Sequence, residues 1–184
     1  MLTITAGSNW KRTFIRRILR CSLILLCFSL ANCSAAREQT SAGNVRAVNH
    51  TTGAINWMSV NGYRVHGGGG RTCCVAMPTR WRPGITLDIE WEIDPNRFAK
   101  IKRLPPEKGF GFDDEAWAAH TARFRRYKKF VEVPEWPGTE SCELNVHFFS
   151  CGRVEVSTHC LAIYHPDYPI QSGHREEEPD ICPK

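Results

Sequence analysis

The sequence of 184 residues lacks the features that mark several large classes of protein. Its apolar segment at residues 22–30 is much shorter than the roughly 20 apolar residues that a membrane-spanning helix needs. No serine stands in the Gly-x-Ser-x-Gly turn of an α/β-hydrolase, and the glycine run at residues 67–70 is not followed by the Lys and Ser or Thr of a P-loop. No internal repeat is present. These absences argue against a membrane-spanning protein, an α/β-hydrolase and a P-loop nucleotidase.

Acidic residues are absent from the first 32 residues, where basic residues precede the short apolar segment. This order predicts a secretory signal peptide at residues 1–32. The segment ends in Leu30-Ala31-Asn32-Cys33, which resembles a bacterial lipobox, although Asn32 stands where Gly, Ala or Ser is usual. We therefore expect lipidation of Cys33. Because Ser34 rather than Asp follows, we expect an anchor on the periplasmic face of the outer membrane of a Gram-negative bacterium.

Charge gives no reason to expect nucleic acid as a partner. The formal net charge is +5, and the five basic residues of the expected signal peptide account for all of it: Lys11, Arg12, Arg16, Arg17 and Arg20. The exported part of the chain is therefore formally neutral, so no excess of positive charge remains to attract nucleic acid or anionic lipid.

Six cysteines follow Cys33, and an even number in an exported chain predicts disulfides. They are Cys73, Cys74, Cys142, Cys151, Cys160 and Cys182. None of their spacings matches the Cys-x-x-Cys pattern of a zinc site. We expect neither a metal site nor a cofactor.

Strand patterns dominate the exported part of the chain. Residues 85–93 alternate strictly between apolar and polar, and weaker strand signals lie at residues 45–50, 55–60, 73–77 and 130–133. Acidic residues followed by basic ones predict one amphipathic helix at residues 113–129. Its basic end is either a solvated face, which we favour, or a patch for lipid headgroups or an acidic partner. We expect a flexible tether at residues 33–43 and one mainly β (α+β) domain at residues 44–184, an antiparallel β-sandwich-like fold with disulfides.

A hairpin is predicted between Cys142 and Cys160. A three-residue loop, Ser150-Cys151-Gly152, places Phe148 opposite Val154 and Val146 opposite Val156, so that apolar residues face one another. The same register places Cys142 opposite Cys160, within reach of a disulfide. Cys151 and Cys182 are then expected to pair with Cys73 and Cys74, in an order that the residues leave open.

No catalytic residue is expected. The glycine run could form an oxyanion hole, but no nucleophile accompanies it. The histidines share no spacing that would mark a base or a ligand set: His66, His120, His147, His159, His165 and His174.

Two kinds of loop residue remain as candidate contacts with a partner, because Trp and Arg are enriched at interface hot spots and glycine permits close approach. They are Gly68, Gly69, Arg80, Trp81, Arg82 and Trp136. The alternative, which stays open, is that the glycines form a plain connection and that each Trp folds over the β core.

Several segments together resemble a family of small proteobacterial lipoproteins of unknown function, whose members are found beside lipase effectors of the type VI secretion system. The segments are GGGGRTCCVAMPTRWRPG, DIEWEI, VEVPEW, LNVHFFSCGRVEV and HPDYPI, within residues 44–171. The resemblance implies a non-enzymatic immunity protein that binds and inhibits a phospholipase or lipase effector. An envelope lipoprotein that binds a ligand or serves a structural role is the alternative, and an apolar pocket would favour it. An enzyme would need polar groups that converge only in the folded chain.

Overall fold

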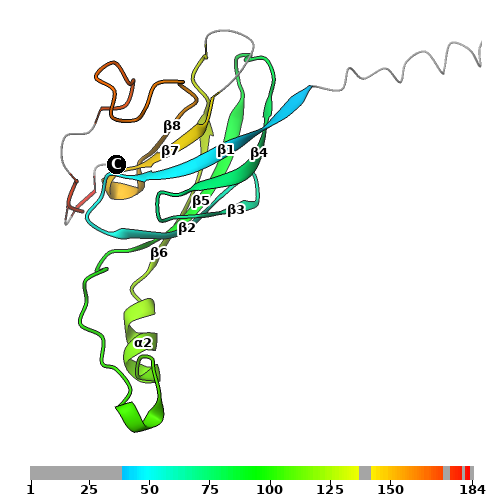
Figure 1. Ribbon diagram of the computed structural model, residues 1–184. Coiled ribbons are helices and arrows are strands. Elements are labelled where there is room, and N and C mark those ends of the chain that lie inside the picture. Colours follow the sequence, from blue (N-terminus) through cyan, green and yellow to red (C-terminus); the bar gives the residue numbers. More distant parts are fainter. Residues whose placement is uncertain (1–38, 137–141, 172–174, 180, 183–184) are drawn as a thin grey trace, which may run out of the picture. The chain divides into compact units, whose positions relative to one another are not determined.

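The computed structural model describes residues 39–136, 142–171, 175–179 and 181–182. These residues form eight strands in two four-stranded sheets, with one α-helix and two short 3-10 turns (Figure 1). The mainly β, sandwich-like fold expected from the sequence is therefore confirmed. Residues 39–184 make up one compact unit. The expected signal peptide and Cys33 lie outside the described residues. No helix within those residues is long and apolar enough to cross a membrane.

The first sheet has the order β4-β1-β7-β8. Its strands are β1 (Thr40–Asn49), β4 (Arg71–Pro78), β7 (Leu144–Phe148) and β8 (Val154–Ser157). β1 runs antiparallel to β4 and parallel to β7, and β7 and β8 form an antiparallel hairpin. β1 begins inside the tether expected at residues 33–43, because Thr40 already pairs with Pro78 across the sheet. Residues 40–43, which were expected to belong to the tether, are therefore part of a strand, and residues 33–38 lie outside the described residues.

The second sheet has the order β3-β2-β5-β6 and is antiparallel throughout. Its strands are β2 (Ala54–Val60), β3 (Tyr63–His66), β5 (Thr86–Asp94) and β6 (Arg125–Glu132). β3 was not predicted. It is joined to β2 by Asn61 and Gly62, both with positive φ (51° and 80°), which is the conformation favoured in two-residue hairpin turns. The Asn-Gly pair was therefore a usable sequence signal for this hairpin.

The helix predicted at residues 113–129 is wrong in its second half. The helix α2 covers only Asp114–Thr121, and the chain from Arg125 onward is strand β6. Arg126 binds Glu92 at 2.7 Å, and Lys128 binds Asp88 at 2.8 Å, both across the pair β5/β6. These ion pairs with the acidic face of β5 thus stabilise residues 125–132 as a neighbouring strand. Tertiary pairing outweighs the local charge pattern that suggested a helix.

The core lies between the two sheets and uses the apolar face predicted for β5. Leu87, Ile89, Trp91 and Ile93 are all buried. The Trp91 ring lies 5.2 Å from the Tyr127 ring of β6 and 5.2 Å from the Phe148 ring of β7. Strands of both sheets therefore meet at Trp91, whose burial removes a large apolar surface from water.

The β7–β8 hairpin has the predicted register. Val146 pairs with Val156 and Phe148 with Val154. The loop is Ser150–Gly152, with φ of 58° at Cys151 and 62° at Gly152. Cys142 is bonded to Cys160, with their Cα atoms 5.1 Å apart, which is the pair that the register predicted.

The pairing expected for the other four cysteines is wrong. Cys73 is bonded to its neighbour Cys74, and Cys151 is bonded to Cys182. The strand order explains this result. Cys73 and Cys74 lie on β4 at one edge of the first sheet, whereas Cys151 lies in the turn beside β8 at the other edge.

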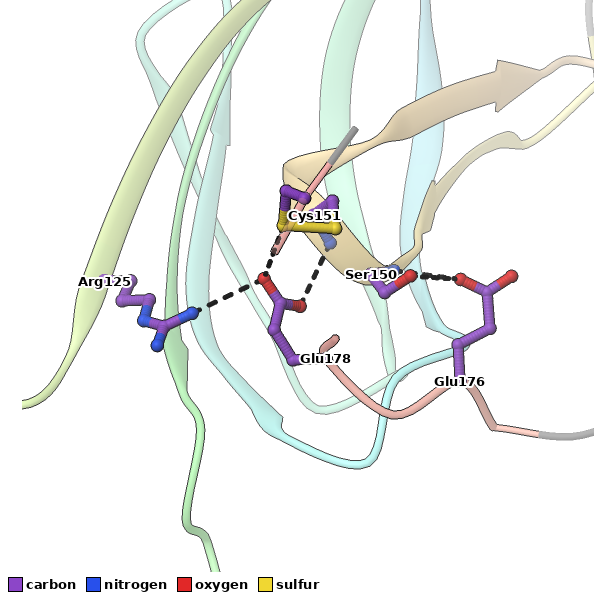
Figure 2. Close-up of a disulfide and its surroundings, with 6 residues drawn as sticks. Arg125, Ser150, Cys151, Glu176 and Glu178 are labelled. Atoms are coloured by element: carbon purple, nitrogen blue, oxygen red, sulfur yellow. Dashed lines mark hydrogen bonds and ion pairs between the residues drawn. A yellow bond between two sulfur atoms is a disulfide. The ribbon is translucent and has the colours of Figure 1, made fainter. Parts of the chain in front are cut away.

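The segment that carries Cys182, here called the C-terminal strap (residues 175–179 and 181–182), crosses two turns of the sandwich. The Glu176 amide donates to the His50 carbonyl at 2.6 Å, and the Glu176 carbonyl accepts from the Thr52 amide at 3.0 Å. Figure 2 shows the Glu176 and Glu178 carboxylates facing the β7–β8 turn. Glu176 accepts from the Ser150 amide and hydroxyl at 3.0 and 2.8 Å, and Glu178 accepts from the Cys151 amide at 3.0 Å. The strap therefore ties the β1–β2 turn to the β7–β8 turn.

Candidate functional site: an aromatic arm beside an arginine-lined pocket

The chain between β5 and β6, residues 95–124, leaves the sandwich and is here called the arm. It projects from the end of the two strands and carries α2 (Figure 1). No residue of α2 is buried. The arm therefore contributes little to the core and presents most of its side chains to solvent.

Local contacts order the arm. Its two limbs pair through the Leu104 amide to the Gly111 carbonyl, at 3.1 Å, and the Asp113 amide to the Lys102 carbonyl, at 2.9 Å. The Asp113 carboxylate caps α2 by accepting from the Ala116 amide at 3.2 Å, as acidic residues commonly do at a helix start. These backbone and cap contacts give the arm a defined shape.

The base of the arm is attached to β5 by a polar contact. His120 Nε2 lies 3.1 Å from Asp94 Oδ2, and both side chains are only 10% exposed. The second Asp94 oxygen accepts from the Asn96 amide at 2.8 Å, at the point where the chain leaves the strand. Asp94 thereby holds both the first residues of the arm and the end of its helix.

Large apolar side chains of the arm face water. Phe98 is 78% exposed, Phe110 is fully exposed and Trp117 is 43% exposed. The Arg97 guanidinium lies over the Phe98 ring at 4.4 Å, and the Arg103 guanidinium lies over the Phe112 ring at 5.3 Å. Exposed apolar side chains that cluster on one element mark a contact surface, and aromatic rings with arginines are the residue types that anchor such surfaces.

The predicted contact residues do not form one surface. Gly68 and Gly69 precede β4, whereas Arg80, Trp81 and Arg82 follow it. The eight residues of β4 separate the two groups by about 26 Å at roughly 3.3 Å per residue. The residues expected to act together therefore lie at opposite ends of β4.

Burial also removes the two tryptophans from the candidate surface. Trp136 is only 4% exposed and belongs to the core. Trp81 packs partly buried against that core, and its indole Nε1 donates to the Val133 carbonyl at 3.0 Å. Both rings cover the end of the β core, which is the alternative that the sequence left open. Arg80 and Arg82 remain exposed.

The glycine run lines a cavity at the arm-bearing end. A Cβ atom on Gly67 would lie 2.1 Å from the Ile55 carbonyl oxygen, and Gly69 has a φ of +83°. Glycine is therefore needed where the chain passes from β3 in one sheet to β4 in the other. The cavity has a volume of about 310 Å³ and is lined by residues 67–69 with Arg46, Arg97 and Arg175. Gly68 and Gly69 thus keep a place in the candidate site.

The half-buried His50 and the buried His147 form a hydrogen-bonded chain that ends on the buried Tyr168. His50 Nε2 lies 2.8 Å from His147 Nδ1, and His147 Nε2 lies 2.9 Å from the Tyr168 hydroxyl. Burial lowers the pKa of His147 to about 3, and burial is also the main cause that lowers the pKa of His50. Burial raises the pKa of Tyr168. The imidazoles are therefore neutral at physiological pH, and the arrangement is a hydrogen-bonded part of the interior.

The remaining described histidines of the sequence each have a hydrogen-bond partner. The rings of His66, His159 and His165 each accept a hydrogen bond from the backbone amide two residues later, at 3.0 to 3.3 Å. His120 binds Asp94, and His174 lies outside the described residues. None of these contacts brings a histidine to a nucleophilic side chain in the part of the chain that the structure describes.

The one group with metal-ligand spacing in the described chain is Cys151, Glu178 and Cys182, whose ligand atoms lie within 4.8 Å of one another. Both sulfur atoms are joined in a disulfide. A thiolate is the form of cysteine that binds a metal, so this group is better explained as part of the strap.

Sequence reasoning missed the arm, His50 and the three arginines of the cavity. The segment Phe110-Gly111-Phe112, which follows two prolines at residues 105 and 106 and a glycine at residue 109, was an available sign of an irregular aromatic segment. The arginines carry no such sign, since they are distant in sequence and lie on β1, the arm and the strap.

A family model described as a protein of unknown function, DUF3304, matches residues 48–156. The match runs from the end of β1 into β8 and includes the glycine run and the whole arm. No curated protein and no solved structure matches the chain. Because the match covers more than half of its length, the chain belongs to the DUF3304 family.

Proposed function

We propose that this protein is a lipid-anchored immunity protein of the outer membrane, which binds and inhibits a phospholipase or lipase effector of the type VI secretion system. It acts by covering its partner and not by catalysis. The observation that carries the proposal is the arm, which exposes Phe98, Phe110 and Trp117 while Asp94 and His120 hold its base. Exposed rings on an ordered element are suited to bury a large apolar area in a complex without a large ordering cost.

The placement of the arm also favours this function. β1 begins at Thr40 and ends at Asn49. A short turn joins Asn49 to β2, whose first residue, Ala54, pairs with Asp94 at the base of the arm. The arm therefore lies at the end of β1 opposite Thr40. A lipid on Cys33 would hold the molecule by the Thr40 side and leave the arm free for a partner. Anchoring would also raise the local concentration of the inhibitor at the membrane.

The arm carries the residue types that form the centre of a stable interface. A specific complex buries about 800 Å² on each partner, and a few aromatic and arginine side chains supply most of the affinity. The arm offers the three exposed rings together with basic residues in its first half: Arg97, Lys100, Lys102, Arg103 and Lys108. These charges suit a partner surface with acidic groups around an apolar centre.

The test combines binding with inhibition. The compact unit of residues 39–184, which contains its own core and all three disulfides, is mixed with a type VI phospholipase effector from the same genome. We expect a complex and loss of phospholipase activity. Phe110→Ser should weaken binding at least tenfold, whereas Phe130→Ser, which alters a ring that is 72% exposed on β6, should leave binding unchanged.

Two results would contradict the proposal. Full phospholipase activity at saturating, demonstrated binding would exclude direct inhibition. Equal weakening by Phe110→Ser and Phe130→Ser would exclude the arm as the specific contact surface.

A second candidate function is binding of an apolar ligand in the envelope, because the structure has a mainly apolar cavity of about 280 Å³ along β8. Val131, Val154, Val156 and Trp136 line it. The buried Trp136 Nε1 has no hydrogen-bond partner among the described residues. An apolar ligand with one acceptor atom would satisfy that donor. Native mass spectrometry of the protein purified from its own envelope tests this function, and a ligand-free mass would count against it.

A further inference from the structure

The arginine-lined cavity carries an inference that the proposed function does not require. Three arginines and the glycines of residues 67–69 line one cavity of about 310 Å³, and no described acidic residue lines it. We propose that this cavity binds a phosphate group, carried either by a phospholipid headgroup or by a free phosphate. The inference rests on the positive charge of the three arginines, on the absence of side chains at residues 67–69 and on the three separate elements that carry the arginines.

The positive charge of the cavity is largely unpaired. Arg46 shares Glu143 with Arg71, at 3.6 and 2.8 Å respectively, so one carboxylate faces two guanidinium groups. Arg97 and Arg175 form no ion pair with any residue that the structure describes. The buried Nε of Arg46 also lacks a hydrogen-bond partner within the described residues. An anion in the cavity would supply the missing negative charge.

The glycine run gives this anion access to the backbone. Gly67 leaves no room for a side chain, since a Cβ atom would lie 2.1 Å from the Ile55 carbonyl oxygen. Gly68 is held in place by its amide, which donates to His66 Nδ1 at 3.0 Å. The wall of the cavity at residues 67–69 is therefore bare backbone, which leaves room for a ligand between the arginines.

The number and origin of the arginines favour phosphate over carboxylate. Arg46 lies on β1, Arg97 at the start of the arm and Arg175 at the start of the strap, so the three donors come from three separate elements. A planar carboxylate is satisfied by one guanidinium in a bidentate pair. A tetrahedral phosphate group presents several oxygen atoms in different directions and accepts from several guanidinium groups at once. A neutral ligand would leave the charges of Arg97 and Arg175 without an ion pair.

The test is a titration of the compact unit of residues 39–184 with inorganic phosphate, followed by calorimetry and by the amide NMR signals of residues 67–69. We expect saturable binding and shifts of those signals. Arg97→Gln and Arg175→Gln, which alter exposed side chains that have no ion pair, should each weaken binding about tenfold, the loss typical of one charge-assisted contact. Arg80→Gln is the matched control at the opposite end of β4 and should leave the affinity within about twofold.

Vesicles distinguish the two sources of the phosphate group. Sedimentation with phosphatidylglycerol–phosphatidylcholine vesicles that is competed by inorganic phosphate and lost in Arg97→Gln would identify a lipid headgroup. Phosphate binding without sedimentation would identify a free phosphate. The proposal is overturned if neither probe binds, if acetate binds as tightly as phosphate, or if Arg80→Gln weakens binding as much as Arg97→Gln. Circular dichroism verifies that each variant is folded.

Discussion

At the scale of single residues, burial sets the protonation of the chain formed by His50, His147 and Tyr168. His147 is 1% exposed and contacts His50 and Tyr168 through its two ring nitrogens. Its pKa of about 3 means that the folded protein keeps this imidazole neutral at a pH where the unfolded chain, with a pKa near 6.5, binds a proton. Stability must therefore depend on pH in a direction that can be worked out.

The unfolding free energy should fall as the pH falls from about 6.5 towards 3. In this range the unfolded chain binds more protons than the native protein, so His147 contributes a slope of up to about 1.4 kcal/mol per pH unit. Urea unfolding at pH 7.0, 6.0 and 5.0 measures it. His147→Gln cannot titrate, so its stability should depend less steeply on pH than that of the wild type. Equal slopes for the two proteins would contradict the buried, neutral assignment.

Two glycines of the same run should respond differently to a side chain. Gly67→Ala places a Cβ atom 2.1 Å from the Ile55 carbonyl oxygen, and we expect a loss of about 1–3 kcal/mol because the backbone must move. Gly70→Ala meets nothing within 4 Å and should change stability by less than about 1 kcal/mol. Thermal unfolding of both variants tests this difference. A similar loss in both would mean that the run acts through chain flexibility and not through close packing.

At the scale of elements, the strand β6 shows how a neighbour decides local structure. Residues 113–129 contain acidic residues followed by basic ones, a pattern that also suits one long helix. Only Asp114–Thr121 is helical, because Arg126 and Lys128 find carboxylates on β5 and because Tyr127 stacks on the buried Trp91. No pattern within the segment itself contains that information.

The three disulfides should differ in their effect on stability because they close chain loops of different length. Cys151 and Cys182 are 31 residues apart, so we expect Cys151→Ser with Cys182→Ser to cost about 2–4 kcal/mol. Cys73 and Cys74 are adjacent and enclose no loop, so Cys73→Ser with Cys74→Ser should cost less than about 1 kcal/mol. Guanidinium chloride unfolding of both double variants under oxidising conditions compares them. The reverse order would contradict the role given to the strap.

At the scale of the whole molecule, aromatic residues divide between the core and the arm. Trp136 is 4% exposed, whereas Phe110 is fully exposed. Trp136→Ala should therefore destabilise the fold by about 3–5 kcal/mol, and Phe110→Ala should change stability by less than about 0.5 kcal/mol. Chemical unfolding measures both. A large loss in Phe110→Ala would mean that the arm belongs to the core and is not a free contact surface.

Part of this architecture was predictable because it depends on residues close together in the sequence. The alternation in residues 85–93 identified β5, and the β7–β8 loop fixed a register that places Cys142 beside Cys160. The candidate contact residues were harder to predict. The local sequence around a tryptophan beside a proline does not distinguish a ring that covers the core, as Trp136 does, from a ring that faces a partner.

By itself, the sequence determined the mainly β fold, the central strand β5, the β7–β8 hairpin and the Cys142–Cys160 disulfide, because periodicity and turn chemistry are local properties. Only the tertiary structure decided that residues 125–132 form a strand and that the bonds Cys73–Cys74 and Cys151–Cys182 form. It also decided that the arm is exposed and that Arg46, Arg97 and Arg175 lie around the glycine run. These features depend on which distant segments become neighbours. The packing of the two sheets sets that choice, and no single segment encodes it.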